Sequence, residues 1–182
     1  MSVAALLLLL IGGYDLLAPG VQSVVITTPV GRLEGFHVDY GSRTNSSIYF
    51  GQVIHARRCE AHSAQADIFL GIPYVQPPTG QNRYKAPIPL TQISSTTYNA
   101  TAYKKMCPQE PFDPATMDED CLYLNVFTPN ATSANKWPVM LWIHGGGLNS
   151  GSASEFHYKG AVRNLVSRGV VVVTIEYRLG IF

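Results

Sequence analysis

The stretch PVMLWIHGGGLNSG, residues 138–151, does most to decide the fold of this 182-residue chain. An apolar run of strand-forming residues ends at His144, and three consecutive glycines follow, Gly145, Gly146 and Gly147. Glycine loses more conformational freedom on folding than any other residue and contributes no side chain to a core. Three glycines directly after a buried strand therefore indicate a loop whose backbone approaches another group closely.

A helix and a second strand follow this loop. In the segment 158–169 the apolar residues that share one helical face are Ala161, Val162, Leu165 and Val166. Gly169 stands where a helix-terminating glycine belongs. The next segment, VVVVTIEY at 170–177, is an almost unbroken β-branched run, which fits a strand of a parallel sheet that is covered on both faces.

This order of elements predicts a strand–loop–helix–strand unit of α/β type over residues 138–177. Its glycine loop lies at the carboxyl end of the first strand, where ligands bind in open α/β sheets. The earlier part of the chain predicts a hairpin at 23–38 and short strands at 66–74 and 121–129. A proline-rich surface loop is expected at 75–89.

The composition agrees with a folded domain. Hydrophobic residues make up 46% of the chain and charged residues 14%, which is too apolar for a disordered protein. The formal net charge is +1, so nothing electrostatic favours nucleic acid or an acidic membrane surface as a partner. We predict no nucleic-acid partner, no metal ion and no cofactor.

The N-terminus predicts a protein of the secretory pathway. The apolar run at residues 3–11 is too short to span a bilayer, which takes about 20 residues, but it has the length of the hydrophobic core of a signal peptide. We predict a signal peptide over residues 1–20, with cleavage after Gly20 or as late as Ser23. Three N-glycosylation sequons agree with secretion, at Asn45, Asn99 and Asn130.

The three cysteines fit the same compartment. Cys107 and Cys121 bracket an acidic loop that contains three prolines and cannot bury much apolar surface. In an oxidising compartment a disulfide across this loop would stabilise the fold by about 3 kcal/mol on the loop-entropy argument. Cys59 is then left without a partner, and we expect it to be unpaired.

The three glycines do not fit the usual nucleotide loops. A phosphate-binding loop needs a lysine at a fixed spacing, and none follows before Lys159. A dinucleotide fingerprint needs Gly-x-Gly-x-x-Gly at the start of a helix, whereas LNSGSASEF at 148–156 predicts a long loop. The remaining interpretation is the His-Gly-Gly-Gly loop of lipases and esterases, whose backbone N–H groups stabilise an oxyanion.

Four stretches in the same order resemble the N-terminal part of type-B carboxylesterases, the family that also holds cholinesterases and neuroligins. They are FLGIPYVQPP at 69–78, EDCLYLNVFTP at 119–129, HGGG at 144–147 and VVVVTIEYRLG at 170–180. The resemblance implies an α/β-hydrolase fold for residues 21–182. We expect only the N-terminal part of that fold, with a hairpin, several strands of the central sheet and one crossover helix.

The resemblance also implies roles for the glycine loop. Gly146 and Gly147 would donate two of the oxyanion hydrogen bonds, and a backbone N–H after the catalytic serine would donate the third. His144 and Gly145 would support the loop, with His144 orienting its backbone and taking no part as the catalytic histidine.

Two further pairs are implied by the same resemblance. Cys107 and Cys121 would form the first disulfide of the family. Arg83 and Glu119 would form its structural ion pair, a stability feature whose net contribution is small if the pair is buried.

The family chemistry needs a serine on a Gly-x-Ser-x-Gly turn, followed by an acid and a histidine. No Gly-x-Ser-x-Gly occurs in this sequence. We therefore expect the chain to be a fragment that ends before the nucleophile and is inactive alone, and we expect the full-length protein to be a secreted serine hydrolase of small carboxylic esters.

Two other functions remain open. One is a non-catalytic adhesion or signalling protein like the neuroligins, although the complete HGGG favours an enzyme. The other is a cholinesterase, but the loop between Cys107 and Cys121 contains no tryptophan to contact a quaternary ammonium group. The sequence predicts no membrane span and leaves the oligomeric state open.

The segment VIHARRCEAHSAQ, residues 53–65, matches nothing in the family pattern. Two interpretations carry equal weight. One is a surface-loop insertion. The other is a retained short intron, because any Val53 codon begins with GT and a Gln65 codon can be CAG.

Overall fold

The computed structural model describes residues 22–42, 63–93 and 96–182. The predicted signal peptide, Asn45 and Cys59 lie outside the described residues, as does most of the segment 53–65. The predictions made for them therefore stay predictions.

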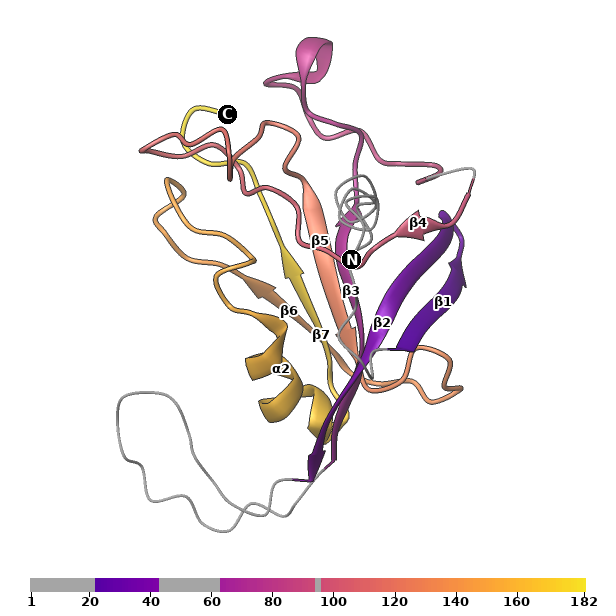
Figure 1. Cartoon of the computed structure of the whole chain (residues 1–182). Coiled ribbons are helices and arrows are strands. Elements are labelled where there is room, and N and C mark those ends of the chain that lie inside the picture. The colour runs from indigo at the N-terminus through magenta and orange to yellow at the C-terminus, as the bar shows by residue number, and fades with distance from the viewer. Residues whose placement is uncertain (1–21, 43–62, 94–95) are drawn as a thin grey trace, which may run out of the picture.

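A mixed, twisted sheet forms the centre of the molecule (Figure 1). Its order along the sheet is β1 (Gln22–Thr28), β2 (Gly31–Ser42), β3 (Ser63–Pro73), β5 (Tyr123–Thr128), β7 (Val171–Ile175) and β6 (Val139–Ile143). A two-residue strand, β4 (Tyr98–Asn99), pairs in parallel with β2. All other pairs are antiparallel except β6 with β7.

The predicted hairpin is confirmed by β1 and β2, which pair antiparallel from Gln22 opposite His37 to Thr28 opposite Gly31. The Thr28 hydroxyl donates a hydrogen bond to the Gly31 carbonyl at 2.7 Å and closes the turn.

Strand β3 begins three residues earlier than the sequence pattern predicts. Its first residues, 63–65, belong to the unmatched segment 53–65, so that segment is not surface loop throughout. Ala64 and Ala66 are both buried and continue the alternation that leads to Ile68. Small apolar side chains fit this face because it packs against the core, and this extends the strand.

The predicted strand–loop–helix–strand unit is confirmed by β6, α2 (Tyr158–Asn164) and β7, with β6 and β7 parallel. The helix is shorter than the segment 158–169 predicted for it. Its last turn tightens into the 3₁₀ helix η2 (Val166–Arg168), as is common at helix ends, and Gly169 follows in the left-handed conformation. Val162 and Val166 are fully buried, as the predicted apolar face requires.

The main core lies between the sheet and this helix. The buried residues that form it are Phe36, Val38, Ala64, Ala66, Ile68, Leu70, Phe127, Val162, Val166 and Val172. A smaller cluster on the opposite face contains Leu33, Phe69, Ile72 and Ala100. The side chains of β7 alternate between buried and half-buried, so this strand is covered less completely than predicted on the second face.

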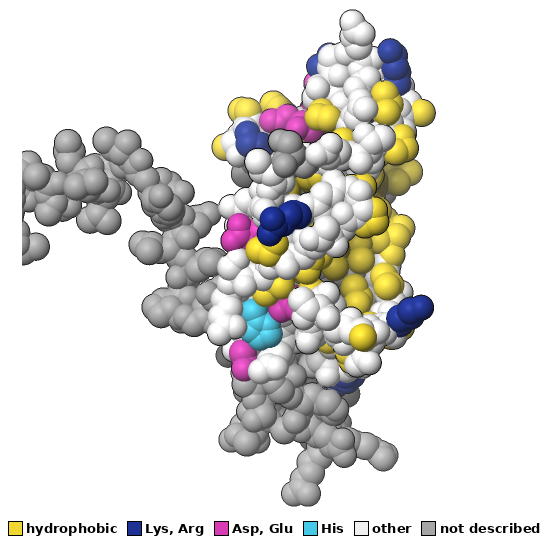
Figure 2. Space-filling view, turned by 90° about the vertical axis from the view of Figure 1, so that its right-hand side faces the viewer, with side chains coloured by type: hydrophobic (Ala, Val, Ile, Leu, Met, Phe, Trp, Pro, Cys, Tyr) yellow, Lys and Arg dark blue, Asp and Glu magenta, His cyan; other side chains and the backbone are white. Residues whose placement is uncertain are grey.

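Strand β6 leaves large apolar side chains exposed. They are Val139, Met140, Leu141 and Ile143, each between 47% and 67% accessible. Figure 2 views the molecule from the side of β1 and β2, away from β6, and there too hydrophobic side chains gather in a band along one edge of the view. No helix in the described part of the chain is long and apolar enough to cross a membrane.

Candidate functional site

The glycine loop, defined here as residues 144–153, leaves the carboxyl end of β6. It lies at the same end of the sheet as the segment 107–121 and the residues after β7 (Figure 1). His144 is buried, whereas residues 145–150 are exposed. The backbone N–H groups of Gly146 and Gly147 donate no hydrogen bond to any of the described residues. They are thus available to a ligand oxygen.

Gly146 is fixed by the shape of the loop itself. Its φ is 118°, and its carbonyl accepts hydrogen bonds from the N–H groups of Asn149 and Ser150, both at 3.1 Å. A Cβ on Gly146 would lie only 1.8 Å from the backbone oxygen of Ser150. Gly147 differs, because a Cβ there would meet nothing within 4 Å, although its φ of 63° is also left-handed. The tight constraint therefore falls on Gly146.

Tyr177 holds the start of the glycine loop in place. Its hydroxyl donates a hydrogen bond to the His144 carbonyl at 2.5 Å. Its ring stacks on the His144 imidazole, with centroids 4.2 Å apart and planes 17° from parallel. The Nδ1 atom of His144 lies 2.9 Å from the Gly145 carbonyl oxygen. His144 therefore contacts the backbone of the loop, and the supporting role that the resemblance implies for it stays a prediction.

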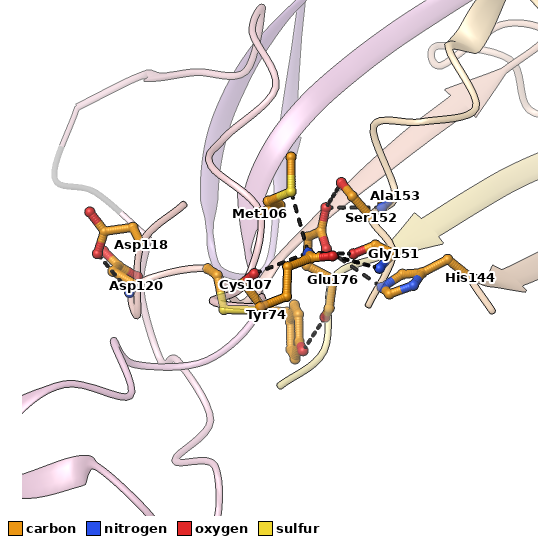
Figure 3. The surroundings of a disulfide bond; sticks show 12 residues. Tyr74, Met106, Cys107, Asp118, Asp120, His144, Gly151, Ser152, Ala153 and Glu176 are labelled. Carbon is orange, nitrogen blue, oxygen red and sulfur yellow. Dashed lines mark hydrogen bonds and ion pairs between the residues drawn. A yellow bond between two sulfur atoms is a disulfide. The ribbon is translucent and has the colours of Figure 1, made fainter. Parts of the chain in front are cut away.

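The end of the loop is held by Glu176, a buried carboxyl group that the sequence analysis did not single out. One of its oxygens accepts hydrogen bonds from the Ser152 hydroxyl at 2.6 Å and the Ala153 N–H at 2.9 Å. Its other oxygen lies 3.6 Å from Nε2 of His144. In the view of Figure 3, Glu176 lies between Cys107 and the loop residues His144 and Ser152. Burial is the main cause that raises the pKa of Glu176 above its ordinary value, although the two hydrogen bonds oppose it.

This raised pKa gives a testable pH dependence. The folded protein holds the Glu176 proton at pH values where the unfolded chain has already released it. The stabilisation linked to this proton is complete below the unfolded pKa and is lost as pH rises through the folded pKa. We therefore expect the melting temperature of the wild type, relative to Glu176→Gln, to fall as pH rises above the ordinary glutamate pKa. Differential scanning calorimetry across this range measures it.

Gln76→Ala changes an exposed residue and no titratable group, and it is the control for the effect of a substitution itself. A difference between wild type and Glu176→Gln that stays constant with pH would contradict the raised pKa of Glu176.

A disulfide and a glutamine connect the loop to the segment 107–121. Cys107 and Cys121 are bonded, with their Cα atoms 5.0 Å apart, and both are fully buried. Gln109 accepts a hydrogen bond from the Gly151 N–H at 2.9 Å and donates one to the Gly151 carbonyl at 3.0 Å. The disulfide implied by the resemblance is thus present, and the sequence analysis missed the contact made by Gln109.

Arg83 and Glu119 form the ion pair that the resemblance implies. The Arg83 Nε and Nη2 atoms each lie 2.6 Å from one oxygen of the Glu119 carboxylate. The two side chains are 47% and 25% exposed, so this is a surface pair and not a buried one.

Two of the three predicted glycosylation sites are described and exposed. The side-chain oxygen of Asn99 accepts a hydrogen bond from the Thr101 hydroxyl at 2.6 Å, and Asn130 accepts one from the Thr132 hydroxyl at 2.9 Å. Asn99 lies in β4. Asn130 follows the carboxyl end of β5, which runs antiparallel to β7 and therefore ends away from the glycine loop.

A surface pocket of about 760 Å³ borders the glycine loop. Asn149 and Ser150 of the loop form part of its wall. The apolar part of the wall comes from Pro108, Phe112, Leu179, Ile181 and Phe182. Glu110 is the one acidic group among the described residues that line it. The described residues contain no cluster of side chains suited to bind a metal ion. The arrangement offers free N–H donors beside a mainly apolar pocket.

Comparison with known proteins relates this chain to the carboxylesterase family. A sequence model described as the carboxylesterase family matches residues 22–182. Carboxylesterase 1E from Mus musculus is 42% identical over 139 residues, which cover 68% of this chain and 24% of that protein. Neuroligin-like protein glit-1 from Caenorhabditis elegans is 43% identical over 127 residues, which cover 63% of this chain and 17% of that protein.

A solved structure of a protein named PNB esterase is similar in fold to this chain. Its TM-score is 0.61 at 36% sequence identity, over 87% of this chain and 28% of that one. The chain therefore spans about a quarter of the length of the esterases that it matches.

Proposed function

Because this chain belongs to the carboxylesterase family, we propose that the whole protein, made from its complete coding sequence, is a carboxylic ester hydrolase. The described sheet and its crossover helix are the N-terminal part of the α/β-hydrolase fold, as predicted. The observation that carries the proposal is the pair of unused N–H groups at Gly146 and Gly147, on a loop held rigidly at both ends.

The proposed mechanism forms an acyl-enzyme. A serine hydroxyl adds to the ester carbonyl carbon while a histidine takes its proton, and the carbonyl oxygen becomes an oxyanion. The N–H groups of Gly146 and Gly147 would donate hydrogen bonds to that oxygen. The alcohol then leaves with the proton, and water releases the acid through a second oxyanion in the same position. Each donor is worth about 2.7–4 kcal/mol in the transition state. The serine, acid and histidine would come from residues outside this chain.

The pocket beside the loop suggests uncharged substrates. Its wall is mainly apolar, and Phe112 is the aromatic side chain that the segment 107–121 contributes to it. No tryptophan occurs in that segment, so it lacks the side chain that best binds a quaternary ammonium group. We therefore favour neutral esters over choline esters.

A direct test is covalent labelling of the whole protein with a fluorophosphonate, which reacts with activated serines. We expect one adduct per molecule by intact-mass spectrometry, and none after heat denaturation. A folded protein that stays unlabelled would contradict the serine mechanism.

The second candidate function is non-catalytic adhesion or signalling. It is favoured by the similarity to neuroligin-like protein glit-1, which is of the same order as that to the esterase. An unlabelled protein that binds cell surfaces would support it. The intact glycine loop argues for the enzyme, because a protein without chemistry has no need for a backbone conformation at residue 146 that only glycine adopts readily.

Secretion is a further part of the proposal, with glycans at the sequons. We expect the protein secreted from insect cells to lose mass on treatment with an N-glycosidase, because Asn99 and Asn130 are exposed. Thr132→Ala should remove the glycan at Asn130, whereas Thr132→Ser should keep it because the sequon is preserved. Equal masses of these two variants, apart from the substitution itself, would show that Asn130 is not used.

A further inference from the structure

Gln109 lines the pocket beside the glycine loop but lies outside the four stretches that identify the family. Its side chain nevertheless joins the segment 107–121 to the glycine loop, 42 residues away. We propose that Gln109 is a positioning residue that holds the glycine loop in its oxyanion-binding shape. This inference rests on the proposed function of Gly146 and Gly147.

The contacts of Gln109 are reciprocal. Its carboxamide oxygen accepts from the Gly151 N–H, and its carboxamide nitrogen donates to the Gly151 carbonyl. The same nitrogen lies 3.2 Å from the Cys107 carbonyl oxygen and 3.3 Å from the Met106 sulfur. The side chain therefore forms hydrogen bonds with both backbone polar groups of Gly151 and also contacts Met106 and Cys107, which precede it in the chain. A side chain that only filled space would not need both hydrogen bonds.

Gly151 is well placed to transmit this contact to the first glycine of the loop. A Cβ on Gly151 would lie 2.4 Å from the Gly145 carbonyl oxygen and 2.5 Å from Nδ1 of His144. The backbone of Gly151 thus touches the point where the loop begins. If Gly151 moved toward Gly145, Gly145 would have to move as well, and the N–H of Gly146 would turn away from the oxyanion.

The segment that carries Gln109 is fixed by a disulfide. Gln109 is two residues from Cys107, whose disulfide to Cys121 is fully buried. By contrast, residues 145–150 of the loop are exposed and cannot be held by packing. Donors must be held within a fraction of an ångström to act on a developing charge, and a misplacement of about 1 Å can cost on the order of 10²-fold in rate. Gln109 supplies part of that restraint.

The experiment compares Gln109→Ala, Gln109→Glu and the control Gln76→Ala in the whole protein. Gln76 is an exposed residue of the surface loop, with no part in the site. Glutamate keeps the size and the acceptor of Gln109 but, when ionised, cannot donate to the Gly151 carbonyl. We expect both Gln109 variants to lower kcat for p-nitrophenyl butyrate by on the order of 10- to 100-fold, with KM changed less than about threefold. Gln76→Ala should match the wild type.

Hydrogen exchange of residues 144–153 gives a second readout that does not need activity. In Gln109→Glu a carboxylate oxygen would replace the nitrogen that donates to the Gly151 carbonyl, and the repulsion between these two acceptors should displace Gly151. We therefore expect faster exchange of the Gly151 amide in both Gln109 variants and unchanged exchange in β3 and β5. If Gln109→Ala unfolds, the isosteric Gln109→Glu variant decides.

A Gln109→Glu variant with wild-type kcat and wild-type exchange at Gly151 would overturn the proposal. A raised KM with unchanged kcat would also overturn it, because it would indicate a binding role. If the wild type hydrolyses no ester, the proposed function fails. The exchange rate of the Gly151 amide then still tests whether Gln109 holds the loop. Faster exchange in the Gln109 variants than in Gln76→Ala would support the positioning role of Gln109, and equal exchange would overturn it.

Discussion

Replacing Gly146 with valine in the whole protein is expected to lower kcat for an aryl ester by at least about 10²-fold. The Cβ of any side chain would lie 1.8 Å from the Ser150 backbone oxygen, a distance that requires the loop to change shape. A β-branched residue at a φ of 118° adds further strain. The N–H donors would then leave the position where the oxyanion forms. Steady-state kinetics on p-nitrophenyl butyrate measure the loss.

Two other glycines provide graded controls for this substitution. Gly160 lies in helix α2 in ordinary helical conformation with open space around it, so Gly160→Ala should keep full activity and stabilise the fold by about 0.5–1 kcal/mol. Gly147→Ala introduces no clash but places alanine in a left-handed conformation, which costs about 1–2 kcal/mol. It should lower kcat less than Gly146→Val. A folded Gly146→Val variant with unchanged turnover would remove the oxyanion assignment.

The second large effect concerns residues 21–182 made by themselves in an oxidising compartment. We expect no esterase activity and no stable monomer. The sequence contains no Gly-x-Ser-x-Gly, so no family nucleophile is present. The outer strand β6 exposes Val139, Met140, Leu141 and Ile143. Each large apolar side chain that stays in water forgoes about 1.5–3 kcal/mol of burial, a large share of the 5–15 kcal/mol that stabilises a typical domain.

An exposed apolar edge strand also pairs readily with another chain. Size-exclusion chromatography should therefore show assemblies, and a dye for exposed apolar surface should bind. The double substitution Met140→Lys and Leu141→Glu should reduce both signals, because charges on an edge strand oppose pairing. A monodisperse monomer of the unmodified residues 21–182 with a cooperative thermal transition would contradict this expectation.

The elements that could be predicted from sequence are those with a strong local pattern. The hairpin of β1 and β2 and the unit of β6, α2 and β7 follow from alternation and helical spacing. Strand β4 could not be predicted, since two residues carry no periodicity and its pairing with β2 depends on a partner 65 residues away. The start of β3 was missed for a similar reason, because only its position opposite β2 identifies residues 63–65 as a strand.

In the candidate site, too, some residues could be predicted from a local sequence pattern and others could not. The glycines at 145–147 are contiguous, so the oxyanion loop can be predicted from their local pattern. The residues that hold the loop lie far from it in the chain. Gln109, Glu176 and Tyr177 reach it across 42, 23 and 33 residues. Glu176 could have been singled out from the sequence, because a charged residue directly after the apolar run VVVVTI needs a polar partner if it is buried. Gln109 could not, because its loop has no regular pattern.

The measurement that tests the central claim most directly is the pre-steady-state release of p-nitrophenol from p-nitrophenyl butyrate by the purified whole protein. If the protein is an ester hydrolase that forms an acyl-enzyme on the oxyanion loop described here, a burst approaching one equivalent per molecule should precede a slower steady rate. In the Gly146→Val variant the burst should slow by at least about 10²-fold. Release no faster than in buffer, from a protein that is folded and monodisperse, would contradict the account and favour the non-catalytic alternative.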